Sequence, residues 1–101
     1  MTDSYSLTFE ADTGLFRVGG QLTFSTVNDI LGQAQALFEP INTLAIDLAE
    51  VTRSDSAGLA LLITWMRDAK NSNKNIVFHN IPSQMLAMAN ASGLVELLPL
   101  Q

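Results

Sequence analysis

The stretch Thr43–Trp65, TLAIDLAEVTRSDSAGLALLITW, constrains the fold of this chain more than any other segment. Its first part, Leu44–Leu48, is almost continuously apolar, which predicts a central β-strand covered on at least one face. A polar turn is expected at Glu50–Asp55, followed by an apolar helix from about Ser56 to Lys70. A strand that passes through a short turn into a helix is the unit from which α/β sheets are built.

The rest of the chain alternates between strand and helix signals. Outside the central unit, strands are expected at Leu7–Phe9, Leu15–Val18 and Ile76–Phe78. Helices are expected at Val27–Phe38 and after Pro82, and an apolar tail at Leu94–Leu100. An opening hairpin followed by this alternation predicts an α/β fold whose sheet is parallel in its later part, with right-handed crossovers. Sites in such sheets gather where strands end and helices begin.

Local signals set the expected ends of these elements. Gly19-Gly20 should end the second strand, and Ser25 or Thr26 should cap the first helix by accepting a hydrogen bond from a free backbone N–H. Ser83 should cap the last helix, and Gly93 should end it.

Composition excludes several classes of protein. The chain has 101 residues, enough for one domain spanning 1–101, with 48% hydrophobic and 15% charged residues. It has no cysteine, so disulfides and thiol catalysis are ruled out. The net charge is −5 and the five basic residues form no stripe, which argues against nucleic acid as a partner. No signal peptide or membrane-spanning run is evident, so we expect a soluble cytoplasmic domain that reaches a membrane only through a partner.

The turn around Asp55 and Ser56 holds the densest set of functional groups. Either Asp55 or Ser54 is placed to cap the helix, and helix capping is the plainer interpretation of this motif. Ser56 would then lie in the first helical turn, where free N–H groups and the helix dipole favour negative charge. A phosphate on Ser56 would therefore be compatible with the helix and would add about −1.5 to −2 charge beside Asp55.

Catalytic and metal-binding interpretations have weaker support. A hydrolase with Ser56 as nucleophile would need the single histidine, His79, as its base, and the chain has no G-x-S-x-G motif. Asp47, Glu50, Asp55 and His79 do not have a recognised metal-ligand spacing. Gly19-Gly20 is not followed by a phosphate-binding signature. We expect no catalytic residue, no metal and no cofactor.

The helix after Ser56 has apolar residues all round. On a helical wheel, one face should pack on the sheet: Leu59, Leu62, Ile63, Met66 and Ala69. The opposite face contains Ala57, Ala60, Leu61, Thr64 and Asp68, with Trp65 at its border. This outer face either contacts a partner protein or is buried by neighbouring helices, and periodicity does not distinguish the two.

The segment from Leu44 to Leu62 resembles the signature of the STAS domain family (sulphate transporter and anti-sigma factor antagonist). That signature is an apolar strand ending in Asp-Leu, a short turn, and Asp-Ser/Thr-x-Gly-Leu at the start of a helix, matched here by Asp55–Leu59. Val18–Leu22 resembles the family's Gly-x-Leu-Asp segment, with Thr23 in place of the Asp. The resemblance implies a STAS fold: a small mixed sheet with about three to four helices, mainly on one face.

Two branches of the family imply different partners. Ser56 matches the position that is phosphorylated in anti-sigma factor antagonists, where the partner serine kinase is also the anti-sigma factor. The Val-Thr-Arg-x-Asp turn around Arg53, the Gly58-Leu-Ala-Leu-Leu run and the Leu-Leu-Pro tail resemble the cytoplasmic STAS subunit of the Mla phospholipid-transport ABC system. We prefer this second branch, in which a non-enzymatic subunit binds and regulates the ATPase.

The resemblance places the partner-binding surface on the turn and the outer face of the following helix. The residues expected to form it are Arg53, Ser54, Asp55, Ser56, Ala57, Gly58, Ala60, Leu61, Thr64 and Trp65.

Overall fold

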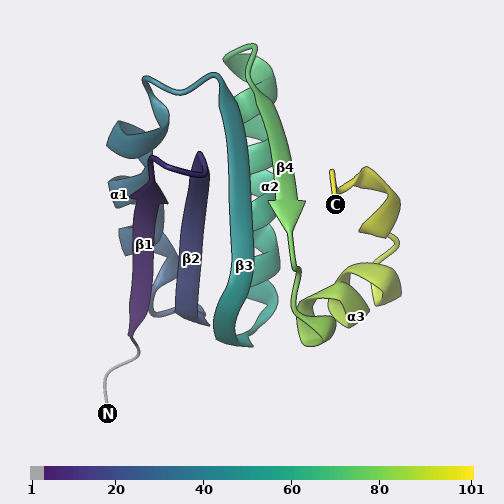
Figure 1. The fold of residues 1–101 in the computed structure, drawn as a ribbon. Helices are drawn as coiled ribbons and strands as arrows, with labels where there is room; N and C mark the ends of the chain where they lie inside the picture. The colour runs from purple at the N-terminus through teal and green to yellow at the C-terminus, as the bar shows by residue number, and fades with distance from the viewer. Residues whose placement is uncertain (1–3) are drawn as a thin grey trace.

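The computed structural model describes residues 4–101 as a four-stranded sheet covered by helices (Figure 1). In chain order the elements are β1 (Tyr5–Glu10), β2 (Leu15–Leu22), α1 (Val27–Phe38), β3 (Thr43–Ser54), α2 (Ser56–Asn71), β4 (Asn75–His79), α3 (Ser83–Ala91) and a 3₁₀ turn (Val95–Leu97). This architecture agrees with the predicted α/β fold, a mixed sheet with an opening hairpin and parallel strands after it.

The sheet has the strand order β1-β2-β3-β4. β1 and β2 are antiparallel, and β2, β3 and β4 are parallel to one another. α1 and α2 lie on the same face of the sheet, while α3 lies beyond the edge formed by β4 (Figure 1). Because α1 and α2 each connect two parallel strands, they run in the same direction, and their N-termini meet at one end of the sheet.

The core lies between the sheet and the two covering helices. Alternate residues of β3, Leu44, Ile46 and Leu48, point into it and are buried. Three aromatic rings link the layers: the Phe16 and Phe38 centroids are 4.7 Å apart, and the Phe38 and Trp65 centroids are 5.3 Å apart. These edge-on contacts fix the spacing between α1 and α2.

All four strands are longer than the sequence predicted, and β2 and β3 are extended the most. β2 continues through Gly19-Gly20 to Leu22, so the prediction that the glycines end it was wrong. The register with β3 shifts between Arg17 and Gly19 and again after Gly20, whose φ is +80°. The strand thus absorbs the glycines as irregularities instead of ending at them. Likewise β3 runs to Ser54, so most of the segment predicted as a turn is paired strand.

Two of the predicted helix caps were also wrong. Thr26 occupies the cap position of α1 but makes no side-chain capping bond. Its hydroxyl instead donates to the Gln21 carbonyl at 2.7 Å and accepts from the Thr23 amide at 3.0 Å, which closes the loop between β2 and α1. Ser83 is the first residue of α3, and the residue that precedes it, Pro82, holds the cap position.

Candidate functional site

Asp55 organises the junction between β3 and α2. It is the N-cap of α2, and its Oδ1 accepts a hydrogen bond from the Ala57 amide at 2.8 Å. Its other oxygen, Oδ2, accepts from the Phe24 amide at 3.1 Å, and its own amide donates to the Leu22 carbonyl at 3.2 Å. One carboxylate therefore starts the helix and ties it to the loop that follows β2.

This tie holds Phe24 beside the start of α2. Phe24 is 85% exposed, the largest exposed fraction among the large hydrophobic residues in the range 4–101. It lines a shallow cavity of about 380 Å³ together with residues of α1 and the first turns of α2, including Ser56, Ala57, Ala60 and Thr64. An exposed aromatic ring at the rim of such a hollow is typical of a protein-binding surface.

Sequence reasoning did not identify Phe24 as a site residue. Its local signal is an aromatic residue inside the polar loop Thr23–Thr26, where no apolar face is available to bury it. This local signal is weak, because it does not show where the loop lies. The loop reaches Asp55 only through the pairing of β2 with β3.

Gly58 allows α2 to cross the ends of β2 and β3 closely. A β-carbon at this position would overlap the Ser54 hydroxyl oxygen and lie 2.8 Å from the Leu22 carbonyl oxygen. Ser54 is buried, and its hydroxyl donates to the Asp55 carbonyl at 3.0 Å. The Asp-Ser-x-Gly-Leu pattern thus has a local structural reason. Asp55 caps the helix, and Gly58, which has no β-carbon, lets the ends of β2 and β3 pack closely against the first turn of α2.

The structure separates the predicted docking residues into exposed and buried groups. Arg53, Ser56 and Ala60 are exposed, and Asp55, Ala57 and Thr64 are half-buried. These six residues and Phe24 surround the start of α2, and we call them the docking patch.

Four of the predicted docking residues are buried. Ser54 and Gly58 lie beneath the turn, as described above. Leu61 is 2% exposed and Trp65 is 3% exposed, so neighbouring elements bury this part of the outer face, which is the second of the two alternatives left open by the helical wheel. α2 packs against α1 as well as the sheet, and its buried arc is therefore wider than the single face drawn on the wheel. Ile63 and Met66, predicted to face the sheet, are only half-buried.

The geometry contradicts a hydrolase that uses Ser56 and His79. His79 pairs with Asp47 across β3 and β4, and Asp47 precedes Ser54 by seven positions on β3. That separation is roughly 20 Å along the strand, far beyond hydrogen-bond reach. In addition, side chains alternate along β3, so Asp47 points to the sheet face opposite to the one that carries Ile46 and Leu48. α2, which begins at Ser56, covers the face with Ile46 and Leu48.

The second polar cluster, on the open face of the sheet, has a structural role. Arg17 donates to Asp47 Oδ2 at 2.7 Å and to Glu10 Oε2 at 3.0 Å. Burial would raise the pKa of Asp47, but hydrogen bonds from Asn80 and the Ala49 amide, with the charge of Arg17, hold that pKa below its usual value. The pKa of Glu10 is lowered by its hydrogen bond to Arg17. The cluster links β1, β2 and β3 electrostatically.

Other site types find no support in the described part of the chain. Among residues 4–101, no group of three or more metal-ligating side chains comes together. No helix in the same range combines the length and hydropathy that crossing a bilayer requires.

Known proteins with a similar sequence pattern or a similar structure share this fold. The family model described as "Mlab, STAS domain" matches residues 6–99. The anti-sigma factor antagonist SpoIIAA, in its unphosphorylated form, has a similar structure with a TM-score of 0.69, 17% sequence identity, and coverage of 97% of this chain and 88% of that chain. The Bacillus cell fate determinant SpoIIAA in its phosphorylated form gives a TM-score of 0.68, 19% identity, and coverage of 97% and 91%. At these identities the likeness shows a shared fold, and no curated protein sequence matches the chain.

Proposed function

The chain belongs to the STAS domain family, and from this membership we propose that it is the STAS subunit of an Mla-type phospholipid-transport ABC system. It would act without catalysis, by binding the ATPase subunit through the docking patch. Its place in the cell would be the cytoplasm, at the inner face of the membrane, where the transporter complex holds it. The observation that carries the proposal is the family match, which spans residues 6–99 and whose description names Mlab.

The form of the docking patch supports a protein partner. Small side chains, Ala57 and Ala60, leave a shallow surface on α2, and the Phe24 ring stands at its edge. Exposed aromatic side chains commonly contribute a large share of the binding free energy in interfaces of this kind. Because Asp55 fixes the loop and the helix relative to each other, the patch is organised before the partner arrives.

Co-purification tests the identity of the partner. A tagged chain recovered from detergent-solubilised membranes is expected to bring down an ABC ATPase together with its permease. Recovery of a soluble serine kinase without a transporter would refute the transporter assignment.

A pair of matched variants tests the patch itself. Phe24→Ala should lower the affinity for the ATPase by roughly tenfold or more, because it removes an exposed aromatic anchor. Leu97→Ala is the control, since Leu97 is also an exposed apolar side chain, 63% accessible, on the 3₁₀ turn outside the patch. Both variants should keep the unfolding midpoint of the parent chain. Equal binding by both variants would refute the docking patch.

A second candidate function is that of an anti-sigma factor antagonist. The observation that favours it is the position of Ser56, exposed at the first residue of α2 and next to the capping Asp55. A phosphate there would meet the positive end of the helix dipole and would change the charge of the docking patch. Ser56→Ala should abolish phosphate incorporation by a partner kinase, and Ser56→Asp should weaken binding. Unchanged binding by Ser56→Asp would count against a charge switch.

A further inference from the structure

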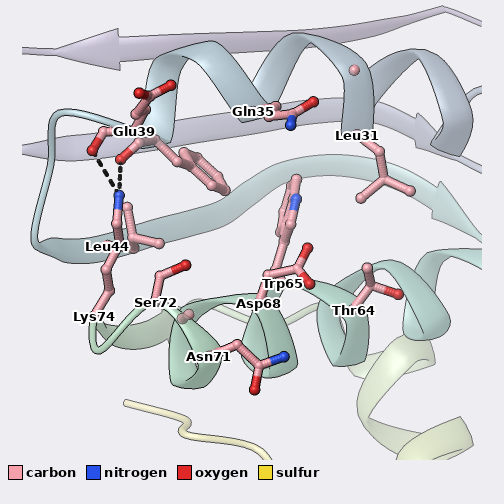
Figure 2. Close-up of a pocket in the computed structure, with 13 residues that line it drawn as sticks. Leu31, Gln35, Glu39, Leu44, Thr64, Trp65, Asp68, Asn71, Ser72 and Lys74 are labelled. Atoms are coloured by element: carbon pink, nitrogen blue, oxygen red, sulfur yellow. Dashed lines mark hydrogen bonds between the residues drawn. The ribbon is translucent and has the colours of Figure 1, made fainter.

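A second hollow lies between α1 and α2, at the end away from the docking patch. It has a volume of about 690 Å³, and its floor is apolar, formed mainly by Leu44, Phe38 and Trp65. Figure 2 shows the Trp65 ring projecting from α2 toward α1, with Gln35 of α1 and Asp68 of α2 beside the opening.

The two hollows adjoin between α1 and α2. Leu31 of α1 and Thr64 of α2 line both of them, and we call the two hollows together the groove. The groove starts at Phe24 and Ser56 and ends near Lys74. The groove follows α2, which extends from Ser56 to Asn71, and the length of this helix gives a groove of roughly 20 Å.

The distal end of the groove is acidic. Glu39 and Asp68 line it, and neither forms an ion pair within residues 4–101. Lys74 is the single basic residue among those that line it, and its Nζ is already engaged with the main-chain carbonyls of Phe38 at 2.6 Å and Glu39 at 2.8 Å (Figure 2). The basic side chains of α2, Arg67 and Lys70, do not line the groove. In addition, α1 and α2 both end here, and helix C-termini carry partial negative charge.

The walls of the groove favour a helical occupant. Both walls are helices, whose backbone groups are bonded internally, so an extended peptide would find no strand edge and would leave its own N–H and C=O groups unpaired over the apolar floor. A helix satisfies its own backbone and can place its side chains between those of α1 and α2. An amphipathic helix would direct apolar residues to the floor.

We propose that this groove binds an amphipathic helix of the partner protein, with basic side chains at the end that faces Glu39 and Asp68. The proposal rests on the proposed function, because it names the partner element that continues from the docking patch. It adds a chemical class for that element: apolar on one face and cationic at its distal end.

Site-specific photo-cross-linking in the purified complex tests the proposal. A photoreactive phenylalanine analogue at Gln35, an exposed residue on the groove wall, should cross-link to a basic amphipathic helix of the partner. The same analogue at Arg67, exposed on α2 but outside the groove, should give at least tenfold less of that product. Cross-linking from Gln35 to a strand or loop, equal yields from the two positions, or a small molecule released from the groove in native mass spectrometry would overturn it.

Matched charge reversals give a second measurement. Asp68→Lys should weaken partner binding about five- to tenfold, with the loss shrinking at high salt. Glu96→Lys, an exposed acid on the 3₁₀ turn, changes the net charge equally but lies outside the groove, so it should leave affinity unchanged. Equal effects of the two variants would refute the acidic groove as a specific feature.

The outcomes for the groove and for the transporter assignment are separate. A cross-link from Gln35 to a basic helix of a serine kinase would retain the groove and refute the transporter. A cross-link from Gln35 to a loop of an ABC ATPase would retain the transporter and refute the helix.

Discussion

Replacing Gly58 by alanine tests whether the close approach of α2 to the ends of β2 and β3 requires a glycine at this position. A β-carbon at this position would overlap the Ser54 hydroxyl oxygen and lie 2.8 Å from the Leu22 carbonyl oxygen. The Leu22 carbonyl belongs to a paired strand, and Ser54 is buried, so neither can move freely. The same change at Gly32, inside α1, meets no atom within 4 Å and provides the matched control.

The two substitutions should change the free energy of unfolding in opposite directions. Alanine is favoured over glycine in a helix by up to about 1 kcal/mol, so Gly32→Ala should stabilise the chain by about 0.5–1 kcal/mol. At Gly58 the same gain is opposed by overpacking, which typically costs about 1–3 kcal/mol, and by displacement of the Ser54 hydroxyl. We expect a net loss of about 1–2 kcal/mol for Gly58→Ala.

The chain carries its own probe for this measurement. Trp65 is the single tryptophan and is 3% exposed, so its fluorescence should shift when urea unfolds the protein. For a domain of this size, the melting temperature of Gly58→Ala should fall by roughly 5–15 °C and that of Gly32→Ala should rise by a few degrees. If both variants are at least as stable as the parent chain, the close approach does not constrain α2, and the structural reason given for the glycine is refuted.

Other substitutions test the remaining features. Leu61→Glu should destabilise the chain by more than about 3 kcal/mol, since it buries a charge in the core, whereas Thr64→Arg at the rim should change the stability by no more than about 0.5 kcal/mol. Thermal melts measure both variants, and equal melting temperatures would show that Leu61 is not part of the core. Asp55→Ala should cost about 1–2 kcal/mol and speed amide hydrogen exchange at Phe24, whose amide loses its acceptor; unchanged exchange would refute that tie. The pKa of Asp47 is lowered in the folded state, so its contribution is present above about pH 4 and lost as pH falls through the folded pKa. Asp47→Asn should thus be about 2 kcal/mol less stable at neutral pH and show a weaker loss on acidification in urea titrations; an unchanged pH profile would contradict this linkage.

Local patterns in the sequence determined the order of the elements and the type of sheet. The apolar run Leu44–Leu48, the 3.6-residue periodicity of Val27–Phe38 and the capping carboxylate of Asp55 each depend on interactions between near neighbours in the chain. The alternation of these elements then implied a largely parallel sheet, because parallel strands need helical crossovers. The STAS family was likewise recognisable from the segment around Asp55 and Gly58.

The tertiary structure decided which of these residues a partner can reach. Periodicity divides a helix into faces but does not show how many neighbours cover them, and α1 covers the side of α2 that holds Leu61 and Trp65. Burial by α1 converted two predicted docking residues into the floor of a groove. Conversely, the pairing of β2 with β3 brought Phe24 beside Asp55, across 31 positions of sequence. The polar turn marked by Asp55 and Ser56 was determined locally, but the surface around it was assembled by strand pairing and helix packing, which depend on distant parts of the chain.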